Sequence, residues 1–223
     1  MHYKFSPSSL SLLGDCPRCF WLRFKQGINR PSSIFPSLPS GMDRIIKVHF
    51  DGYRSKKELP PELISLEGNV KLFEDVELLD VWRNNFKGIK WIDEKRDIVL
   101  RGAVDEILQK DDKLIVLDFK TRGFPVKEDT ASYYQNQLDI YNFLLRKNGY
   151  KTADYAYLLI YHPDKVSKNG DVIFHKDLKK VSTNPKNAEK ILAHALKVLS
   201  AGMPDTHDSC GFCNWVETCK ILY

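Results

Sequence analysis

Cysteines at both ends of the chain are the feature that most restricts how this sequence can fold. Cys210, Cys213 and Cys219 lie within ten residues in the pattern C-x2-C-x5-C, and Cys16 and Cys19 lie near the start of the 223-residue chain. In a reducing compartment, cysteines at such short spacings are more often metal ligands than disulfide partners. Three thiolates are one short of a closed four-ligand site. The fourth is expected from the N-terminal pair, which would join the two ends of the chain.

The composition describes a chain that can bury a core of its own. Hydrophobic residues make up 43% and aromatic residues 12% of the sequence, which is enough for one domain of this length. No apolar run approaches the ~20 residues that span a bilayer, and the opening MHYKFSPSSLSLL lacks the features of a secretory signal. We therefore expect a cytoplasmic protein without a membrane partner. The net charge of +5 permits an anionic partner without requiring one.

The hydrophobic periodicity changes along the chain and predicts a mixed α/β domain. Helical spacing and capping residues predict helices over 6–27, 42–57, 70–85, 130–150 and 184–202, with an irregular Pro- and Ser-rich loop over 28–41. Short β-branched runs predict strands over 97–109, 113–121, 154–163 and 171–178. The polar turn KDDK joins the first two strands into a hairpin. The predicted fold class is α/β in a single domain.

The hairpin carries two acids and a lysine in very apolar surroundings. In LDFKT, Asp118 and Lys120 are two residues apart and project from the same face of a strand. Asp105, in GAVDEI on the partner strand, comes close to Asp118 if the chain turns at KDDK. Two adjacent carboxylates repel unless a cation lies between them, and hard oxygen ligands suit Mg2+ or Mn2+. Beside such a metal, Lys120 would orient an attacking water and stabilise charge on a phosphate. Ordinary ion pairs at strand ends are the alternative.

A second polar pair follows on the next predicted helix. In QNQLDIY, Gln137 and Tyr141 are four residues apart and share one helical face. Both side chains suit holding a phosphate or orienting the lysine. Both are also compatible with the polar edge of a hydrophobic core.

GAVDEI, LDFKT and QLDIY, in this order, resemble the motifs of PD-(D/E)XK nucleases of the RecB type. The resemblance covers about residues 6–219 and implies a restriction-endonuclease-like core, in which helices flank a mixed central sheet. The catalytic residues that it implies are Asp105, Asp118, Lys120, Gln137 and Tyr141. The metal ligands that it implies are Asp105, Asp118 and the backbone carbonyl of Phe119.

The family also places a metal-binding histidine on a helix ahead of the strands. His49 is the candidate, because no other histidine lies between the first helix and the hairpin. It shares a helical face with Ile45, Ile46 and Tyr53, which predicts that it points inward. The glycine that often precedes this histidine in the family lies farther upstream here, at Gly41. A hydrogen-bonded core histidine is the alternative.

The cysteines resemble those of RecB-type nucleases that carry a [4Fe-4S] cluster. Such proteins have one cysteine in an N-terminal helix and C-x2-C-x5-C after the last helix. The ligands implied here are Cys16, Cys210, Cys213 and Cys219, with Cys19 as a free neighbour. The rival is structural zinc bound by Cys16, Cys19, Cys210 and Cys213, which leaves Cys219 unused. Either site would add its binding free energy to folding.

The function that the resemblance implies is a metal-dependent deoxyribonuclease, specifically a single-strand DNA exonuclease with Mg2+ or Mn2+ and a [4Fe-4S] cluster. One nuclease domain would span 1–223, with a helical part over 1–60, a catalytic core over 95–165 and a cysteine-rich clasp over 205–223. The chain most resembles the stand-alone, Cas-four type exonucleases of CRISPR adaptation. CRISPR adaptation proteins, or a nuclease and helicase of DNA repair, are the expected partners. A catalytically silent DNA-binding or scaffold subunit and a zinc-clasped module are the alternatives.

Overall fold

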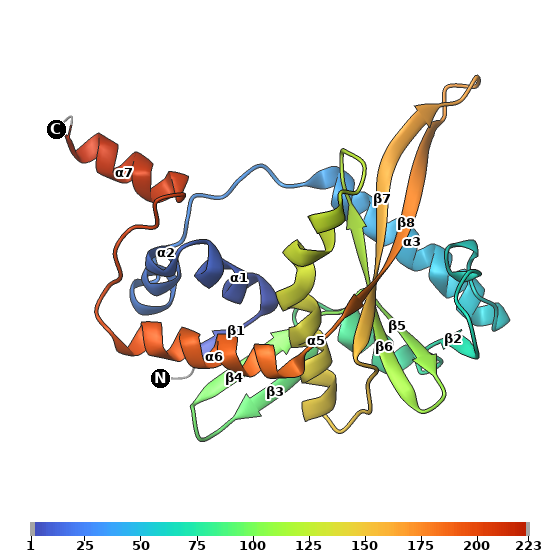
Figure 1. Ribbon diagram of the computed structural model, residues 1–223, viewed down its shortest axis with the longest axis horizontal. Helices are drawn as coiled ribbons and strands as arrows, with labels where there is room; N and C mark the ends of the chain where they lie inside the picture. The colour runs from blue at the N-terminus through green and yellow to red at the C-terminus, as the bar shows by residue number, and fades with distance from the viewer. Residues whose placement is uncertain (1–2, 222–223) are drawn as a thin grey trace.

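Residues 3–221, which the structure describes, form a mixed α/β fold in this computed structural model (Figure 1). The strands are β1 (Tyr3–Phe5), β2 (Val70–Leu72), β3 (Ile89–Asp93), β4 (Ile98–Gly102), β5 (Glu106–Lys110), β6 (Lys113–Thr121), β7 (Tyr155–Val166) and β8 (Val172–Ser182). The α-helices are α1 (Pro7–Asp15), α2 (Pro17–Trp21), α3 (Ser37–Lys56), α4 (Val76–Arg83), α5 (Gln135–Lys147), α6 (Pro185–Ser200) and α7 (Gly211–Ile221). Shorter helical segments are η1 (Leu22–Gln26), η2 (Pro61–Leu63) and η3 (Glu128–Tyr134).

The larger sheet has five strands in the order β2-β5-β6-β7-β8, so β6 lies at its centre. β5 and β6 form an antiparallel hairpin, which turns at Asp111 with a φ of 53°. β6 and β7 pair in parallel, and α5 lies in the connection between them. Antiparallel β8 completes the sheet. A second sheet has the order β1-β4-β3, with β1 parallel to β4.

Alternating side chains on the central strands separate two hydrophobic cores. Val116 on β6 and Leu158 on β7 face α5 and belong to the larger core. Leu117 and Phe119 point to the opposite face, where they pack with Phe50 of α3. Accordingly, α5 and α3 lie on opposite sides of the sheet in Figure 1. The α/β architecture expected from the sequence, a mixed sheet flanked by helices, is confirmed.

Several local expectations are wrong. The helix expected over 70–85 begins only at Val76, after the cap residue Asp75, because Val70–Leu72 pairs with β5 as strand β2. The strand expected over 97–109 is divided between β4 and β5, which belong to different sheets. Strands β1 and β3 and helix α7 were not expected. None of the helices formed by residues 3–221 has the length and apolarity that a membrane span needs.

A buried ion-pair network joins β5 to α3 and α4. Glu106 is fully buried, and its Oε2 accepts hydrogen bonds from Arg54 and from Arg83, the latter at 2.8 Å. Arg83 also donates at 2.9 Å to Asp51 and at 2.8 Å to the backbone oxygen of Asp105. The network therefore holds the chain in place immediately before β5.

Glu106→Gln is expected to destabilise the fold. The amide removes the negative charge that two almost buried guanidinium groups share, and breaking a buried pair in this way costs about 3–5 kcal/mol. Urea unfolding, with the midpoint as readout, measures the loss. Glu128→Gln, at an exposed position in η3, is the matched control and should change stability by less than about 0.5 kcal/mol. Equal midpoints for the two variants would show that the network does not stabilise the fold.

Candidate functional site

The β5–β6 hairpin brings the two predicted acids opposite each other. Glu106 pairs with Leu117 in the register of the hairpin, so the next position along sets Asp105 against Asp118. Asp105 lies just before β5, and its Oδ2 accepts a 2.9 Å hydrogen bond from the amide of Phe119. The proximity predicted from the turn at KDDK is thus present in the structure.

Asp118 is a carboxylate in an almost dry position. Its residue exposure is 1%. Burial, and then the negative charge of Asp105, raise the pKa of Asp118 to about 7, although the ammonium group of Lys120 opposes the shift. Oδ2 forms an ion pair with the ammonium group of Lys120. The two neighbouring carboxylates, Asp118 and Asp105, still repel each other, and a bound cation would relieve that repulsion.

Lys120 lies between the acids and an aromatic ring. Its Nζ is 4.9 Å from the centre of the Tyr134 ring, in a cation–π contact. Burial alone would lower the pKa of Lys120, but the charges of Asp118 and Asp105 outweigh it and raise the pKa. The side chain is therefore a cation at neutral pH.

Helix α5 supplies the polar pair predicted on it. Gln137 Nε2 lies 3.3 Å from Asp118 Oδ1 and donates to the hydroxyl of Tyr141 at 2.8 Å. Burial, followed by the charges of Asp118 and Asp105, raises the pKa of Tyr141, which keeps the phenol neutral. Gly102 on β4 makes room for this ring, because a Cβ there would lie 2.8 Å from a Tyr141 carbon. The structure thus brings Asp105, Asp118, Lys120, Gln137 and Tyr141 together.

Sequence reasoning missed Lys47 on α3. Its Nζ lies 3.0 Å from Asp105 Oδ1 and 2.8 Å from Asp43 Oδ1. Burial lowers the pKa of Lys47, but Asp105 and Asp43 outweigh that effect and the pKa is raised. The spacing of Asp43 and Lys47 marks a pair on one helical face, yet nothing local connects that pair with a residue so far along the chain.

The prediction that His49 points inward is wrong. Its side chain is 40% exposed, and its Nε2 lies 3.1 Å from Glu62 Oε2. The buried face of α3 consists of Ile46, Phe50 and Arg54, which places His49 at the edge of that face. Within residues 3–221, no group of three metal-ligand atoms lying within 4.8 Å of one another includes His49. Its role as a metal ligand stays a prediction.

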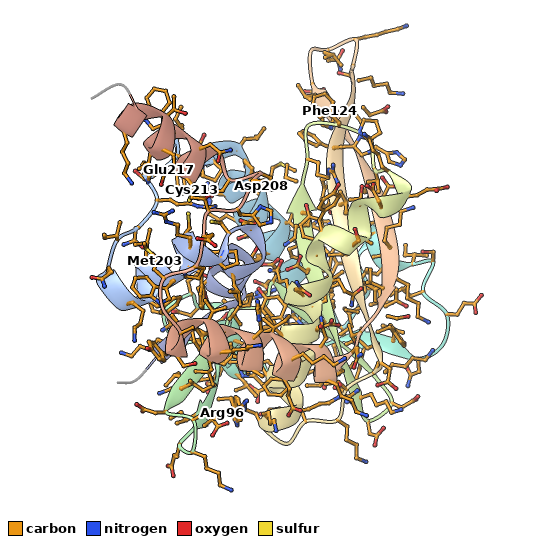
Figure 2. The ribbon with its side chains drawn as sticks, turned by 60° about the vertical axis from the view of Figure 1, so that its left-hand side comes forward. Arg96, Phe124, Met203, Asp208, Cys213 and Glu217 are labelled. Atoms are coloured by element: carbon orange, nitrogen blue, oxygen red, sulfur yellow. The ribbon has the colours of Figure 1, made fainter. Side chains whose placement is uncertain are left out.

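The cysteines of the two chain ends meet, as expected, but the group differs from the one the resemblance implied. Cys16, Cys19, Cys210 and Cys213 are buried, with their sulfur atoms within 4.8 Å of one another. Cys19, expected to be a free neighbour, lies 3.7 Å from both Cys210 and Cys213. Cys219, expected to be a ligand, lies outside the group and is partly exposed. It is six residues past Cys213, on the part of α7 that leads away from the group (Figures 1 and 2).

A guanidinium group completes this cysteine cluster. Arg30 Nη2 lies 3.4 Å from the sulfur of Cys210, and Arg30 Nη1 lies 3.6 Å from Asp15 Oδ2. A positive charge at this position would partly offset the negative charge of thiolates. Figure 2 shows Cys213 beside the N-terminal helices, and Phe124, on the loop after β6, near the β7–β8 ribbon.

Asp118→Asn is expected to stabilise the metal-free protein at high pH. The pKa of Asp118 is about 7 in the folded state and about 3.9 in an unfolded chain. Between these values the folded state holds a proton that the unfolded state has released, so the free energy of unfolding falls as the pH rises. The amide removes this loss, which corresponds to about 4 kcal/mol at most.

Urea unfolding in EDTA, at about pH 5 and about pH 8, tests this linkage. The stability gain of Asp118→Asn should be clearly larger at the higher pH. Equal gains at the two pH values would contradict the raised pKa.

Two comparisons with known proteins found matches to this chain. A family model described as the PD-(D/E)XK nuclease superfamily matches residues 43–220. A solved structure described as "Crystal structure of SSO0001" is 16% identical, with a TM-score of 0.46, and the alignment covers 99% of this chain and 87% of that chain. No curated protein matches the chain. Because the family model spans more than three quarters of the 223 residues, this chain belongs to the PD-(D/E)XK nuclease superfamily.

Proposed function

We propose that this protein is a metal-dependent deoxyribonuclease that hydrolyses phosphodiester bonds at the site of Asp105, Asp118 and Lys120. One observation carries the proposal: the buried carboxylate of Asp118 lies opposite a second carboxylate, Asp105, and pairs with Lys120. Three charges held together in an apolar setting are expensive unless they serve a ligand or a reaction.

The donor set fits a hard divalent cation. Asp105 and Asp118 would hold Mg2+ or Mn2+ together with the backbone carbonyl of Phe119, since these metals prefer carboxylate and carbonyl oxygens. When bound, such an ion polarises the scissile phosphate and lowers the pKa of a bound water. Lys120 and Lys47, which pair with the two acids in the metal-free protein, would then be released toward water and substrate.

The side chains around the acids each have a distinct task. Lys120, kept protonated by the two carboxylates, orients the attacking water and stabilises the charge that develops on the phosphate. Gln137 holds Asp118 in position and is itself held by the Tyr141 hydroxyl. Lys47 pairs with Asp105 from the α3 side before the metal binds. Strand β6, helices α5 and α3 and the segment before β5 thus position one small group of atoms.

The substrate that we propose is single-stranded DNA. A cleft of about 430 Å3 opens beside Gln137 and Tyr141 and includes Arg101, whose charge suits a phosphate backbone. Phe86 next to β3 and Phe124 and Tyr133 after β6 are largely exposed aromatic residues. Exposed rings of this kind stack on unpaired bases. Attack from a strand end would make the protein an exonuclease of CRISPR adaptation or DNA repair in the cytoplasm, as the RecB-type resemblance implies.

The cysteine cluster is proposed to be a metal clasp. Its sulfur–sulfur distances are 3.7 and 3.8 Å, which is about the edge of a tetrahedron of thiolates around one zinc ion, with Zn–S near ~2.3 Å. In a [4Fe-4S] cluster each thiolate binds a different iron, so the sulfurs stand farther apart. The spacing and the presence of Cys19 therefore favour zinc, whereas the C-x2-C-x5-C pattern with Cys219 favours the iron–sulfur cluster.

Single alanine variants of the three central residues test the cleavage. Asp105→Ala, Asp118→Ala and Lys120→Ala should each reduce the cleavage of labelled single-stranded DNA in Mg2+ or Mn2+ by at least about 100-fold, because each removes a group that acts in the transition state. EDTA should abolish the cleavage by the wild type. Binding of the DNA, measured by fluorescence anisotropy, should be retained.

Lys113→Ala is the matched control, since Lys113 lies on the same strand as Lys120 but at its exposed far end. It should cleave at the wild-type rate. Activity in EDTA, or a near wild-type rate in any of the three variants, would remove the metal or that residue from the mechanism. A wild type that binds DNA but never cleaves it would instead identify a DNA-binding subunit.

Two serine variants decide the composition of the clasp. With zinc, the purified protein should be colourless, and Cys19→Ser should lose the metal while Cys219→Ser retains it, because only Cys19 lies in the buried group. Elemental analysis for zinc and iron and the absorption spectrum of protein purified without air are the measurements. A brown protein that contains iron, loses it with Cys219→Ser and keeps it with Cys19→Ser would establish the other ligand set.

A further inference from the structure

Two histidines and an aspartate converge on the β7–β8 ribbon, in a group that shares no residue with the cysteine cluster or with the proposed catalytic acids. His162, His175 and Asp177 offer ligand atoms that all lie within 4.8 Å of one another. Nε2 of His162 is 3.3 Å from Asp177 Oδ2, and Nε2 of His175 is 3.8 Å from Asp177 Oδ1. The two imidazole rings are 5.1 Å apart, centre to centre.

The register of the strands places these three side chains on one face. His162 of β7 lies directly opposite His175 of β8, and Asp177 lies opposite Ile160. Since side chains alternate along a strand, His162 and Ile160 point to the same side, and so do His175 and Asp177. The convergence is thus a product of backbone pairing and does not depend on chance rotamers of mobile side chains.

The hydrogen bonding of His162 leaves an electron-rich gap. Its Nδ1 lies 3.2 Å from the carbonyl oxygen of Pro163, an acceptor that requires the proton to be on Nδ1. The Nε2 of the neutral ring is then an acceptor, and it faces the carboxylate oxygen of Asp177, which is also an acceptor. Two acceptors at 3.3 Å repel unless a proton or a metal ion lies between them. A second imidazole at the same place favours the metal ion.

We propose that His162, His175 and Asp177 form a site for a transition-metal ion of the zinc type. Two imidazole nitrogens and one carboxylate oxygen are ligands that suit Zn2+, and tetrahedral coordination with bonds of ~2.0–2.1 Å puts ligand atoms about 3.3 Å apart. The His162–Asp177 distance already has this value, and His175 needs only a small side-chain movement. The Nδ1 bond to Pro163 is the outer hydrogen bond that orients a metal-binding imidazole. Water would occupy the remaining position.

The location gives this site a structural task. β6 ends at Thr121, which pairs with Tyr161, so from His162 onward β7 is paired with β8 alone and projects as a two-stranded ribbon (Figure 1). An isolated ribbon of two strands is marginally stable in water. A metal ion with one ligand on β7 and two on β8 would fasten the ribbon at its base. Ile160, adjacent to His162 on this face, pairs with Lys120, so the fastened base borders the active site.

Zinc titration of the full-length protein tests the site. The chain is titrated with Zn2+ against a chromophoric chelator, with millimolar Mg2+ present to occupy the catalytic acids. The wild type should bind one more Zn2+ per chain than His175→Gln or Asp177→Asn. Both substitutions lie at accessible positions, with side-chain exposures of 56% and 24%, so neither should disturb folding. His194→Gln, at an exposed position on α6, is the matched control and should bind as the wild type does.

Limited proteolysis gives an independent readout at the ribbon. Trypsin cleaves after Lys165 of β7 and Lys176 of β8 when the paired strands open, and these two cleavages are the readout because Lys168 lies in the turn between the strands. At a Zn2+ concentration about ten times the dissociation constant, opening and hence cleavage of the wild type should become roughly tenfold slower. Cleavage of His175→Gln should not respond to Zn2+. Equal zinc counts for the wild type and His175→Gln, or wild-type cleavage that Zn2+ leaves unchanged, would overturn the proposal.

Discussion

The buried ion pair between Asp118 and Lys120 is the interaction on which the rest of the active site depends. Removing each of the two charges from water costs several kcal/mol. The attraction between them offsets this cost only when further polar groups form hydrogen bonds with the pair. Gln137 of α5 approaches Oδ1 of Asp118. The backbone amide of Phe119, which lies between Asp118 and Lys120 in the sequence, donates a hydrogen bond to Asp105. The other oxygen of Asp118 pairs with Lys120. The negative charge of Asp105 still raises the pKa of Asp118, and a divalent cation between the two acids would relieve that repulsion.

The cysteine cluster supports this arrangement from a distance. It holds α1 and α2 against α7, and these N-terminal helices contribute Leu13 and Phe20 to the same hydrophobic core as Leu138 of α5. Gln137 directly precedes Leu138 on α5 and contacts Asp118. A metal ion bound by the cluster would close a loop of almost the whole chain and would add its binding free energy to folding. The position of α5, and with it the polar support of Asp118, thus depends on the packing that the cluster secures.

The sequence predicted those parts of the site that arise from local pairing. Asp105 and Asp118 are joined by one short hairpin, and its turn residues specify the register. Lys47 escaped prediction because its contact with Asp105 bridges two elements that only the tertiary fold brings together. The same limit applies to the cysteines. The sequence contains both C-x2-C-x5-C, which indicates an iron–sulfur cluster, and two C-x2-C pairs, which indicate zinc. The division between β4 and β5 was missed because Gly102 fits against Tyr141 of α5, a contact that no strand propensity encodes.

Polar side chains interrupt the apolar face of the large sheet toward α5 at two places. Leu158 and Ile160 are fully buried on this face, and His162, the next residue on it, is the first residue of the projecting ribbon. On β6 the apolar Val116 is followed on the same face by Asp118, which is also buried. Because β6 and β7 are parallel, their carboxyl ends lie at one edge, where α5 begins and leaves room for ligands. The parallel pairing thus places Asp118 and the histidine cluster at one edge of a single face, while the hydrophobic core occupies the remainder.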